Sequence, residues 1–192
     1  SEMCIRDRIN LVANFYETQP DKANEYAEQL TQGIRATEWF SLNDNAPDFT
    51  SSQLKNAYKI WAEHFDNEEG GPDRTPKFPI PNNYQFLLRY GHLDENNDAL
   101  QHVKLTLDKI AFGGIYDHLG GGITRYSTDN LWKVPHFEKM LYDNAQIVSL
   151  YCEAYQKFKD ENYKNLVFGS LEFIERELMS PEYAFYLSLI HI

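Results

Sequence analysis

The stretch Gly113–Asn144, GGIYDHLGGGITRYSTDNLWKVPHFEKMLYDN, carries most of the information in this sequence. It combines glycines, two histidines and several carboxylates at a density found nowhere else in the chain. The triple glycine Gly120–Gly122 costs conformational entropy, so it indicates a sharp turn or a close approach to a ligand. No Lys-Ser/Thr follows it, so a phosphate-binding loop is not indicated. Since metal-ligand spacings of Cys and His are also lacking, we predict neither a metal site nor a cofactor.

Helices are predicted on both sides of this stretch. Apolar residues recur there at helical spacing, and glycine or proline separates the periodic segments. Helices with one apolar face alternate with helices that are apolar almost all round, which indicates antiparallel helical hairpins stacked around a centre. An irregular helical bundle is the alternative. We expect helices over 21–40, from Thr50 to before Gly70, and over 82–90, 98–111, 136–158 and 163–178, with a small β-hairpin of 123–127 and 131–134.

Composition sets the class of protein. The 192 residues are 42% hydrophobic and 24% charged, so the chain can bury a core, and no apolar run is long enough to span a membrane. The net charge of -11 argues against a nucleic-acid partner. Aromatic residues make up 15% of the chain, which suits either an aromatic core or a cleft in which sugar rings stack.

The two ends of the chain are predicted not to be natural protein. A short DNA segment that encodes Leu187–Ile192 also encodes Met3–Arg8 when its complementary strand is read in another frame. This segment resembles a transposon end used to prepare sequencing libraries. We therefore expect residues 1–8 and 187–192 to be adapter-derived tails. Cys152 then remains as the one natural cysteine of the sequence, which excludes an intrachain disulfide, and the cytoplasm is the expected compartment.

Acidic and basic side chains are concentrated where the helix over 136–158 is expected to begin. With Pro135 in its first turn, helical geometry predicts two neighbouring faces, one with His136, Lys139 and Asp143 and the other with Glu138 and Tyr142. The free N–H groups and positive dipole end of a first turn help to keep carboxylates ionised. Together with Asp117 and His118, the cluster supplies carboxylates and imidazoles that can serve as acid and base.

Flat side chains in the same stretch suit the face of a sugar ring. They are Tyr116, Tyr126, Trp132 and Tyr142. A structural role is the alternative for every residue of the cluster. The two carboxylates of the helix can pair with Lys139 or Arg125, His118 can bond a backbone carbonyl, and the aromatic rings can belong to the core.

Several motifs are long enough to compare with known families. They are Thr75–Pro79 (TPKFP), Gly114–Gly122 (GIYDHLGGG), Arg125–Ser127 (RYS), Trp132 and Val134–Asn144 (VPHFEKMLYDN). This set closely resembles the spermatogenesis-associated protein 20-like family of thioredoxin-domain-containing proteins, from about Ala23 to Tyr186. The resemblance implies an N-terminal thioredoxin-like domain followed by an (α/α)6 toroid of the six-hairpin glycosidase type, similar to that of N-acylglucosamine 2-epimerases.

The resemblance also implies how this chain is divided. Full-length members of the family are several times longer, and the thioredoxin-like domain with its Trp-Cys-His motif is missing here. We expect residues 9–49 to be the helical connection from that domain, with a break in composition near 43–48, and residues 50–186 to form the first hairpins of the toroid. A toroid buries its inner helices only when it is closed, so we expect this part alone to be inactive.

The resulting hypothesis is a carbohydrate-acting enzyme, either epimerase-like or glycosidase-like. In the first version, His136 or His118 removes a proton next to a carbonyl, and a second group returns it. In the second version, two carboxylates among Asp117, Glu138 and Asp143 act as acid and base across a glycosidic bond.

The remaining residues are assigned to substrate binding. They are Arg125, Tyr126, Trp132, Lys139 and Tyr142, with Lys77 and Phe78 of the TPKFP motif. The expected partners are a sugar-like small molecule and the thioredoxin-like domain of the same full-length chain, with neither nucleic acid nor membrane. The alternative is a redox or chaperone-like protein in which the toroid is a non-catalytic binding scaffold.

Overall fold

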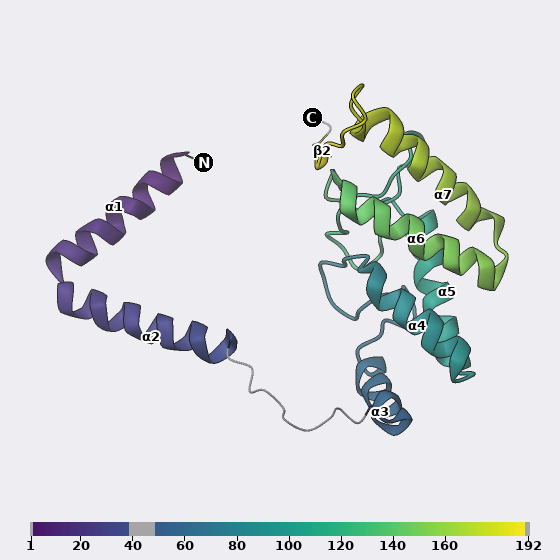
Figure 1. Cartoon of the computed structure of the whole chain (residues 1–192), viewed down its shortest axis with the longest axis horizontal. Coiled ribbons are helices and arrows are strands. Elements are labelled where there is room, and N and C mark those ends of the chain that lie inside the picture. Colours follow the sequence, from purple (N-terminus) through teal and green to yellow (C-terminus); the bar gives the residue numbers. More distant parts are fainter. Residues whose placement is uncertain (1, 39–48, 191–192) are drawn as a thin grey trace. The chain divides into compact units, whose positions relative to one another are not determined.

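The structure is a computed structural model that describes residues 2–38 and 49–190. Contacts divide the chain into two compact units, Ser1–Thr50 and Ser51–Ile192 (Figure 1). The composition break predicted near 43–48 and the helix end predicted at Phe40 lie outside the described residues, as do residues 191 and 192 of the expected C-terminal tail.

The first unit contains two helices, α1 (Glu2–Thr18) and α2 (Pro20–Glu38), which join at Gln19 and pack on each other. The second confirms the helix predicted from residue 21. The first was not predicted, and it begins inside the expected tail of residues 1–8. It forms because its sequence contains neither glycine nor proline. Apolar side chains of α2 such as Tyr26 and Leu30 remain exposed.

The second unit is mostly helical, and its helices begin at recognisable capping signals. The side chains of Asn96 and Asp160 each accept a hydrogen bond from a backbone N–H of the helix that follows. Pro81 occupies the first turn of its helix, where its missing N–H costs nothing. The elements are α3 (Ser51–Ala62), α4 (Pro81–Leu93), α5 (Asn97–Phe112), β1 (Glu138–Met140), α6 (Leu141–Phe158), α7 (Glu161–Phe173), the π-helical turn η1 (Ile174–Leu178) and β2 (Ser188–Ile190).

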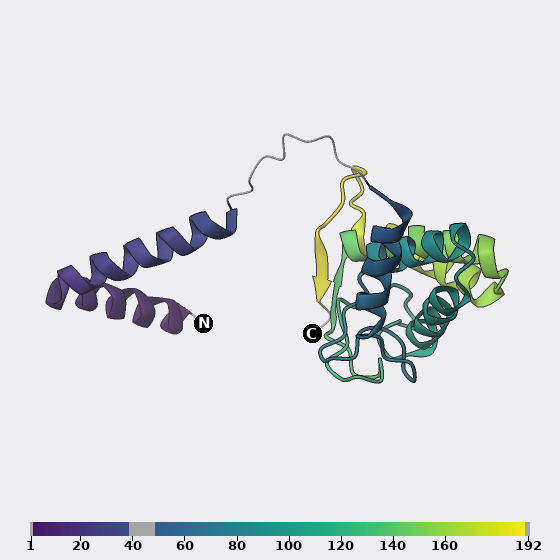
Figure 2. The same cartoon turned by 90° about the horizontal axis from the view of Figure 1, so that it is seen from below.

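Short and long connections alternate along this unit. Only residues 94–96 join α4 to α5, and only 159–160 join α6 to α7, so each pair is an antiparallel helical hairpin (Figures 1 and 2). The long connections, 63–80 and 113–137, precede α4 and α6. Because successive helices run in opposite directions, both long connections lie at the same end of the unit. They touch there, since Lys77 and Ser127 exchange backbone hydrogen bonds of 2.9 Å.

The core lies between the two hairpins. Leu107 and Ile110 of α5 and Ile147 and Leu150 of α6 are fully buried. Each such side chain contributes roughly 1.5–3 kcal/mol through the hydrophobic effect. Helix α4 packs against α5 and α6, and α6 packs against α7. The other faces of α4 and α6 stay exposed, which is what the inner surface of an incomplete toroid would show.

The segment before α6 is extended, so the helix predicted from His136 was wrong at its beginning. Its backbone is held by the preceding loop: the N–H of His136 donates to the Tyr126 carbonyl, and the N–H of Arg125 donates to the Glu138 carbonyl. These bonds replace those that a helix would make. Strand β1 follows and pairs antiparallel with β2, with Lys139 opposite Leu189. Strand β2 lies within the expected tail, but backbone pairing does not depend on which side chains fill a strand.

The predicted β-hairpin is present in a shifted form. Residues 125–128 pair with 134–138 through three backbone hydrogen bonds, instead of 123–127 with 131–134. The reason is Asp129, whose carboxylate accepts hydrogen bonds from the backbone N–H groups of Leu131, Lys133 and Val134. This side chain folds 129–133 into a turn and takes those residues out of the ladder.

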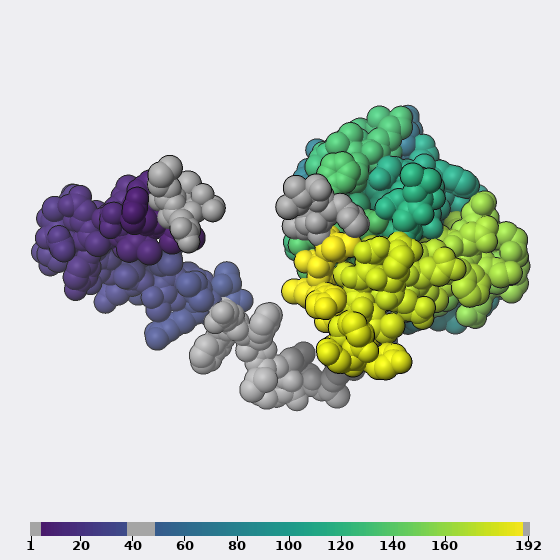
Figure 3. Space-filling view, turned by 90° about the horizontal axis from the view of Figure 1, so that it is seen from above, coloured from purple at the N-terminus to yellow at the C-terminus, as the bar shows by residue number. Residues whose placement is uncertain are grey.

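Two helix ends also differ from the prediction. Helix α3 ends at Ala62, well before Gly70, and the last helix changes from α to π geometry at Ile174. Figure 3 shows α7 and the segment after it as one continuous surface, from yellow-green to yellow, beside the loops coloured teal and green. Among the described residues, no helix combines the length and the apolar character that crossing a membrane requires.

Candidate functional site

Each long connection contains the same turn, FDNEEGG at Phe65–Gly71 and YDHLGGG at Tyr116–Gly122. In both turns the aspartate N–H donates to the carbonyl of the second of two successive glycines, at 2.9 Å for Asp66 and 3.0 Å for Asp117. In both, one carboxylate oxygen accepts the backbone N–H groups two and three residues further on. The last two glycines of each turn have positive φ, which explains why glycine is needed there.

A buried lysine fastens each turn. Lys77 Nζ lies 2.6 Å from Asp66 Oδ2 and 2.7 Å from the Gly70 carbonyl oxygen. Lys139 Nζ lies 2.8 Å both from Asp117 Oδ2 and from the Gly121 carbonyl oxygen. The two lysines are 0% and 3% exposed. Their ammonium groups are closed to a ligand, so the assignment of both to substrate binding is corrected to a role in holding the loops.

Asp117 is held ionised by this arrangement. Burial alone would raise its pKa, but hydrogen bonds from the Gly120 backbone and from Lys139 outweigh burial and lower the pKa to about 2. Such a carboxylate neither releases nor takes up a proton near neutral pH. The acid or base role predicted for Asp117 is therefore not supported by its surroundings.

Two other predicted site residues, His118 and Trp132, make contacts that hold the structure together. His118 Nε2 lies 3.0 Å from the Gly113 carbonyl oxygen, and its ring stands edge-on to Tyr116. The ring of Trp132 is fully buried and its Nε1 donates to the Glu69 carbonyl at 3.0 Å. Trp132 therefore belongs to the core and offers no platform to a sugar. His118 bonds a backbone carbonyl, as its structural interpretation predicted.

Three rings form a stack between the two long connections. The ring of Tyr126 lies 4.6 Å from that of Phe78 on one side and 4.6 Å from that of His136 on the other. Nδ1 of His136 is buried and has no hydrogen-bond partner among the described residues. The stack holds an imidazole with an unused nitrogen beside two flat aromatic faces. Phe78, Tyr126 and His136 were all predicted site residues.

Carboxylates lie next to this stack. Glu138 Oε2 is 3.5 Å from Arg125 Nη1, which is the structural pairing considered for Glu138. Asp143, in the first turn of α6, has a buried Oδ2 without a hydrogen-bond partner among the described residues. Burial raises the pKa of Asp143, the charge of Arg125 opposes this shift, and the negative charge of Glu138 adds to it. Tyr142, also predicted, is exposed beside Asp143 in the sequence.

The carboxyl groups of Glu138 and Asp143 have different surroundings. Glu138 is paired with the Arg125 cation, whereas burial raises the pKa of Asp143. A pair of carboxyl groups of this kind, with an imidazole close by, is suited to general acid–base chemistry. Within the described ranges, no three His, Cys, Asp or Glu side chains are grouped so that they could hold a metal ion.

The prediction from sequence missed the turn at Asp66, and it assigned Lys77 to substrate binding instead of to this turn. A signal was available, because FDNEEGG and YDHLGGG align as an internal repeat. It also missed Arg74 and His102, which line a cavity beside the stack.

The chain was compared with family models, curated proteins and solved structures. No family model matches the chain. Spermatogenesis-associated protein 20 of Homo sapiens is 37% identical over 167 residues, which are 84% of this chain and 21% of that protein. The chain thus spans about a fifth of the length of this relative.

Solved structures show the fold. Cellobiose 2-epimerase from Bacillus thermoamylovorans B4167 superposes with a TM-score of 0.61 and 16% identity, over 72% of this chain and 40% of that one. An unsaturated glucuronyl hydrolase specific for heparin gives a TM-score of 0.58 and 15% identity, over 72% of this chain and 42% of that one. The helical hairpins described above are therefore part of a toroid, and the irregular bundle is excluded. The comparisons confirm the predicted resemblance: this chain matches one part of spermatogenesis-associated protein 20, and that part has the (α/α)6 toroid fold.

Proposed function

We propose that the complete protein is an acid–base enzyme acting on a sugar-like small molecule, and that the site includes His136, Glu138 and Asp143. The observation that carries this proposal is the buried, unpartnered carboxyl oxygen of Asp143, whose pKa is raised by burial and which lies near the Glu138–Arg125 ion pair. A raised pKa on one of two neighbouring carboxyl groups is typical of a general acid. The likeness to sugar epimerases and a glucuronyl hydrolase in fold is consistent with this chemistry.

The same groups suit two reactions. In an epimerase-like reaction, His136 takes the proton from a carbon next to a carbonyl, and the protonated Asp143 carboxyl group delivers a proton to the other face of that carbon. In a glycosidase-like reaction, Asp143 protonates the leaving oxygen while the Glu138 carboxylate serves as base or nucleophile. In both, the ring of Phe78, whose exposed fraction is 37%, supports the sugar.

The decisive experiment uses the complete protein encoded by the source gene, with a panel of free sugars and glycosides. Incorporation of deuterium from heavy water into a recovered sugar reports the epimerase-like reaction, and release of a new reducing end reports hydrolysis. Asp143→Asn should lower turnover by about 100-fold or more in either case. His136→Gln should abolish deuterium incorporation but spare hydrolysis.

A matched control is Asp98→Asn, because Asp98 is an exposed aspartate in the first turn of α5, outside the cluster. It should retain full activity. An Asp143→Asn variant as active as Asp98→Asn would contradict the proposal. If no substrate of the panel reacts, the result favours the alternative in which the toroid is a binding scaffold for the thioredoxin-like domain. The cytoplasm remains the compartment that we propose for the protein.

A further inference from the structure

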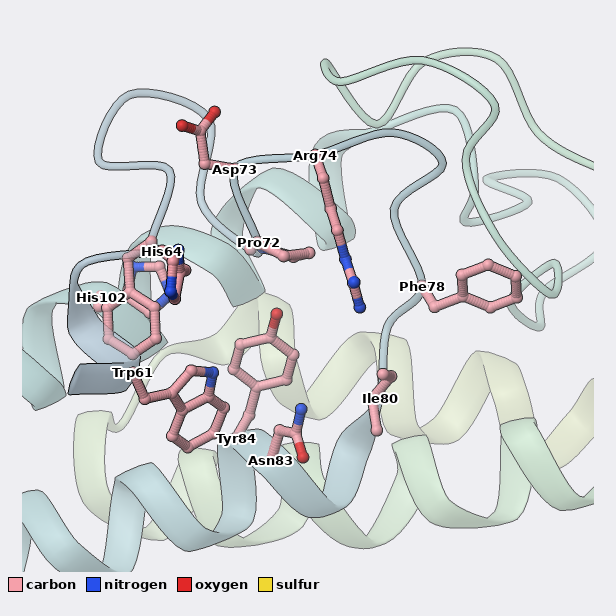
Figure 4. Close-up of a pocket in the computed structure, with 12 residues that line it drawn as sticks. Trp61, His64, Pro72, Asp73, Arg74, Phe78, Ile80, Asn83, Tyr84 and His102 are labelled. Carbon is pink, nitrogen blue, oxygen red and sulfur yellow. The ribbon is translucent and has the colours of Figure 1, made fainter. Parts of the chain in front are cut away.

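A cavity of about 370 Å³ has Phe78, which contacts Tyr126, among its lining residues. It is bounded by the end of α3, the connection 63–80, the beginning of α4 and the middle of α5 (Figure 4). Aromatic side chains form much of its wall: Trp61, Phe65, Phe78 and Tyr84. Its volume falls in the range of sites for small molecules, and apolar walls with a few polar groups are typical of such sites.

Arg74 supplies a free positive charge to this cavity. Its side chain extends from the loop toward α4 and lies between Tyr84 and Phe78, whereas the carboxylate of the adjacent Asp73 points away (Figure 4). In the described part of the chain, the Arg74 guanidinium makes no hydrogen bond or ion pair. Arg74 is exposed to solvent, so its guanidinium is accessible to an anion that enters the cavity.

Further polar groups in the cavity also lack partners. His102 is 6% exposed, its ring stacks on Phe65 at 3.8 Å, and its Nδ1 is buried without a hydrogen-bond partner among the described residues. Burying such a group without a partner costs free energy, but this nitrogen is closed to a ligand, so His102 contributes its stacked ring to the cavity wall. The side chain of Asn83, half-buried in the first turn of α4, also lines the cavity.

We propose that this cavity binds the anionic group of the sugar-like substrate, with Arg74 holding a phosphate or a carboxylate. The planar guanidinium donates two parallel hydrogen bonds to either anion, and the aromatic walls pack against the ring. Phe78 lines this cavity and also contacts Tyr126 of the stack, so the cavity adjoins the proposed site. The inference rests on the proposed function for the reacting part of the substrate, but anion binding is measured without turnover.

The test is calorimetric titration of the complete protein with glucose 6-phosphate, glucuronate, inorganic phosphate and glucose. We expect one or both anionic sugars to bind at least about tenfold more tightly than glucose, and the preferred sugar identifies phosphate or carboxylate as the group recognised. Arg74→Gln should weaken binding of that sugar about tenfold or more and leave glucose unchanged. The affinity of Arg74→Lys for that sugar should lie between those of the wild type and Arg74→Gln, because lysine keeps the charge but cannot donate two parallel hydrogen bonds. Lys133→Gln removes an exposed charge outside the cavity and should bind like the wild type.

Thermal melting verifies that each variant is folded. Equal affinity of the wild type for glucose and both anionic sugars would overturn the inference, and so would an Arg74→Gln variant that binds the anionic sugar like the wild type. Anion binding that depends on Arg74, without turnover of any sugar, would support this inference while rejecting the proposed enzyme. If neutral sugars react and Arg74→Gln does not change their turnover, the proposed enzyme is supported and this inference is rejected.

Discussion

Lys139 Nζ lies 2.8 Å from Asp117 Oδ2, and it is among the least exposed polar groups of the described chain. The ammonium also faces the ring of Phe173 at 4.4 Å from the centroid. A charge in this position is tolerated because carboxylate, carbonyl and ring surround it. Since Lys139 follows Glu138 on β1, the same contact fixes the strand that carries a proposed catalytic carboxylate.

Removing this lysine should destabilise the protein. Lys139→Met keeps the apolar stem but leaves the Asp117 carboxylate without its cation, and we expect a loss of roughly 2 kcal/mol or more in the free energy of unfolding. The control is Lys133→Met, at an exposed lysine of the 129–133 turn, which should change stability by less than about 0.5 kcal/mol. Urea denaturation measures both. Equal stability of the two variants would show that the buried pair contributes nothing.

Asp117 should make stability depend on acid. Its folded-state pKa of about 2 lies below the ordinary value of 3.8, so the folded state binds fewer protons than the unfolded chain between these values. Its contribution is fully present above pH 4 and is lost as the pH falls toward 2. Denaturation at pH 2.5 and pH 6 should therefore show a smaller difference for Asp117→Asn than for the wild type. An unchanged difference would argue against the lowered pKa.

His102 should add a second pH dependence in a different range. Burial lowers its pKa from 6.5 to about 4, so the imidazole is neutral in the folded protein at pH 7. Protonation favours the unfolded chain, and stability should fall as the pH drops from 6.5 to 4, by at most about 3 kcal/mol. His102→Phe, which retains the stack on Phe65, should have a flatter melting profile between pH 4.5 and 7. A wild-type profile that is already flat there would contradict this assignment.

Gly121 should not tolerate a side chain. Its φ is +74°, and a Cβ atom there would collide with the carbonyl oxygen of Gly169 on α7. We expect Gly121→Ala to lower the free energy of unfolding by about 2 kcal/mol or more and to loosen the loop that meets α7. Gly33→Ala is the matched control, because a Cβ at Gly33 of α2 meets open space and alanine favours a helix. Similar melting of the two variants would exclude a special role for the turn.

The helices could be predicted because their apolar residues follow the helical period, and α4, α5 and α6 contain most of the predicted ranges. What failed depended on contacts that are distant in sequence. A tryptophan such as Trp132 suits a sugar platform by residue type alone, but its Nε1 donates a hydrogen bond to a carbonyl 63 residues away. His136–Met140 reads as a helix start until the backbone bonds to Tyr126 and Arg125 are known. Sequence placed the candidate acid–base residues in one stretch, but it could not show which of them are paired and which lack a partner.

The spacing between the two turns predicts where the corresponding loops lie in the rest of the natural protein. Asp66 and Asp117 occupy the same position in successive loops, so the interval between them is the length of one hairpin and its loop. We expect the same pattern to recur at about this interval along the complete gene product. The pattern is an aromatic residue, an aspartate and a double glycine, with a buried lysine downstream. Each recurrence would mark a later loop at the same end of the toroid. We predict that the side chains next to those positions complete the proposed site.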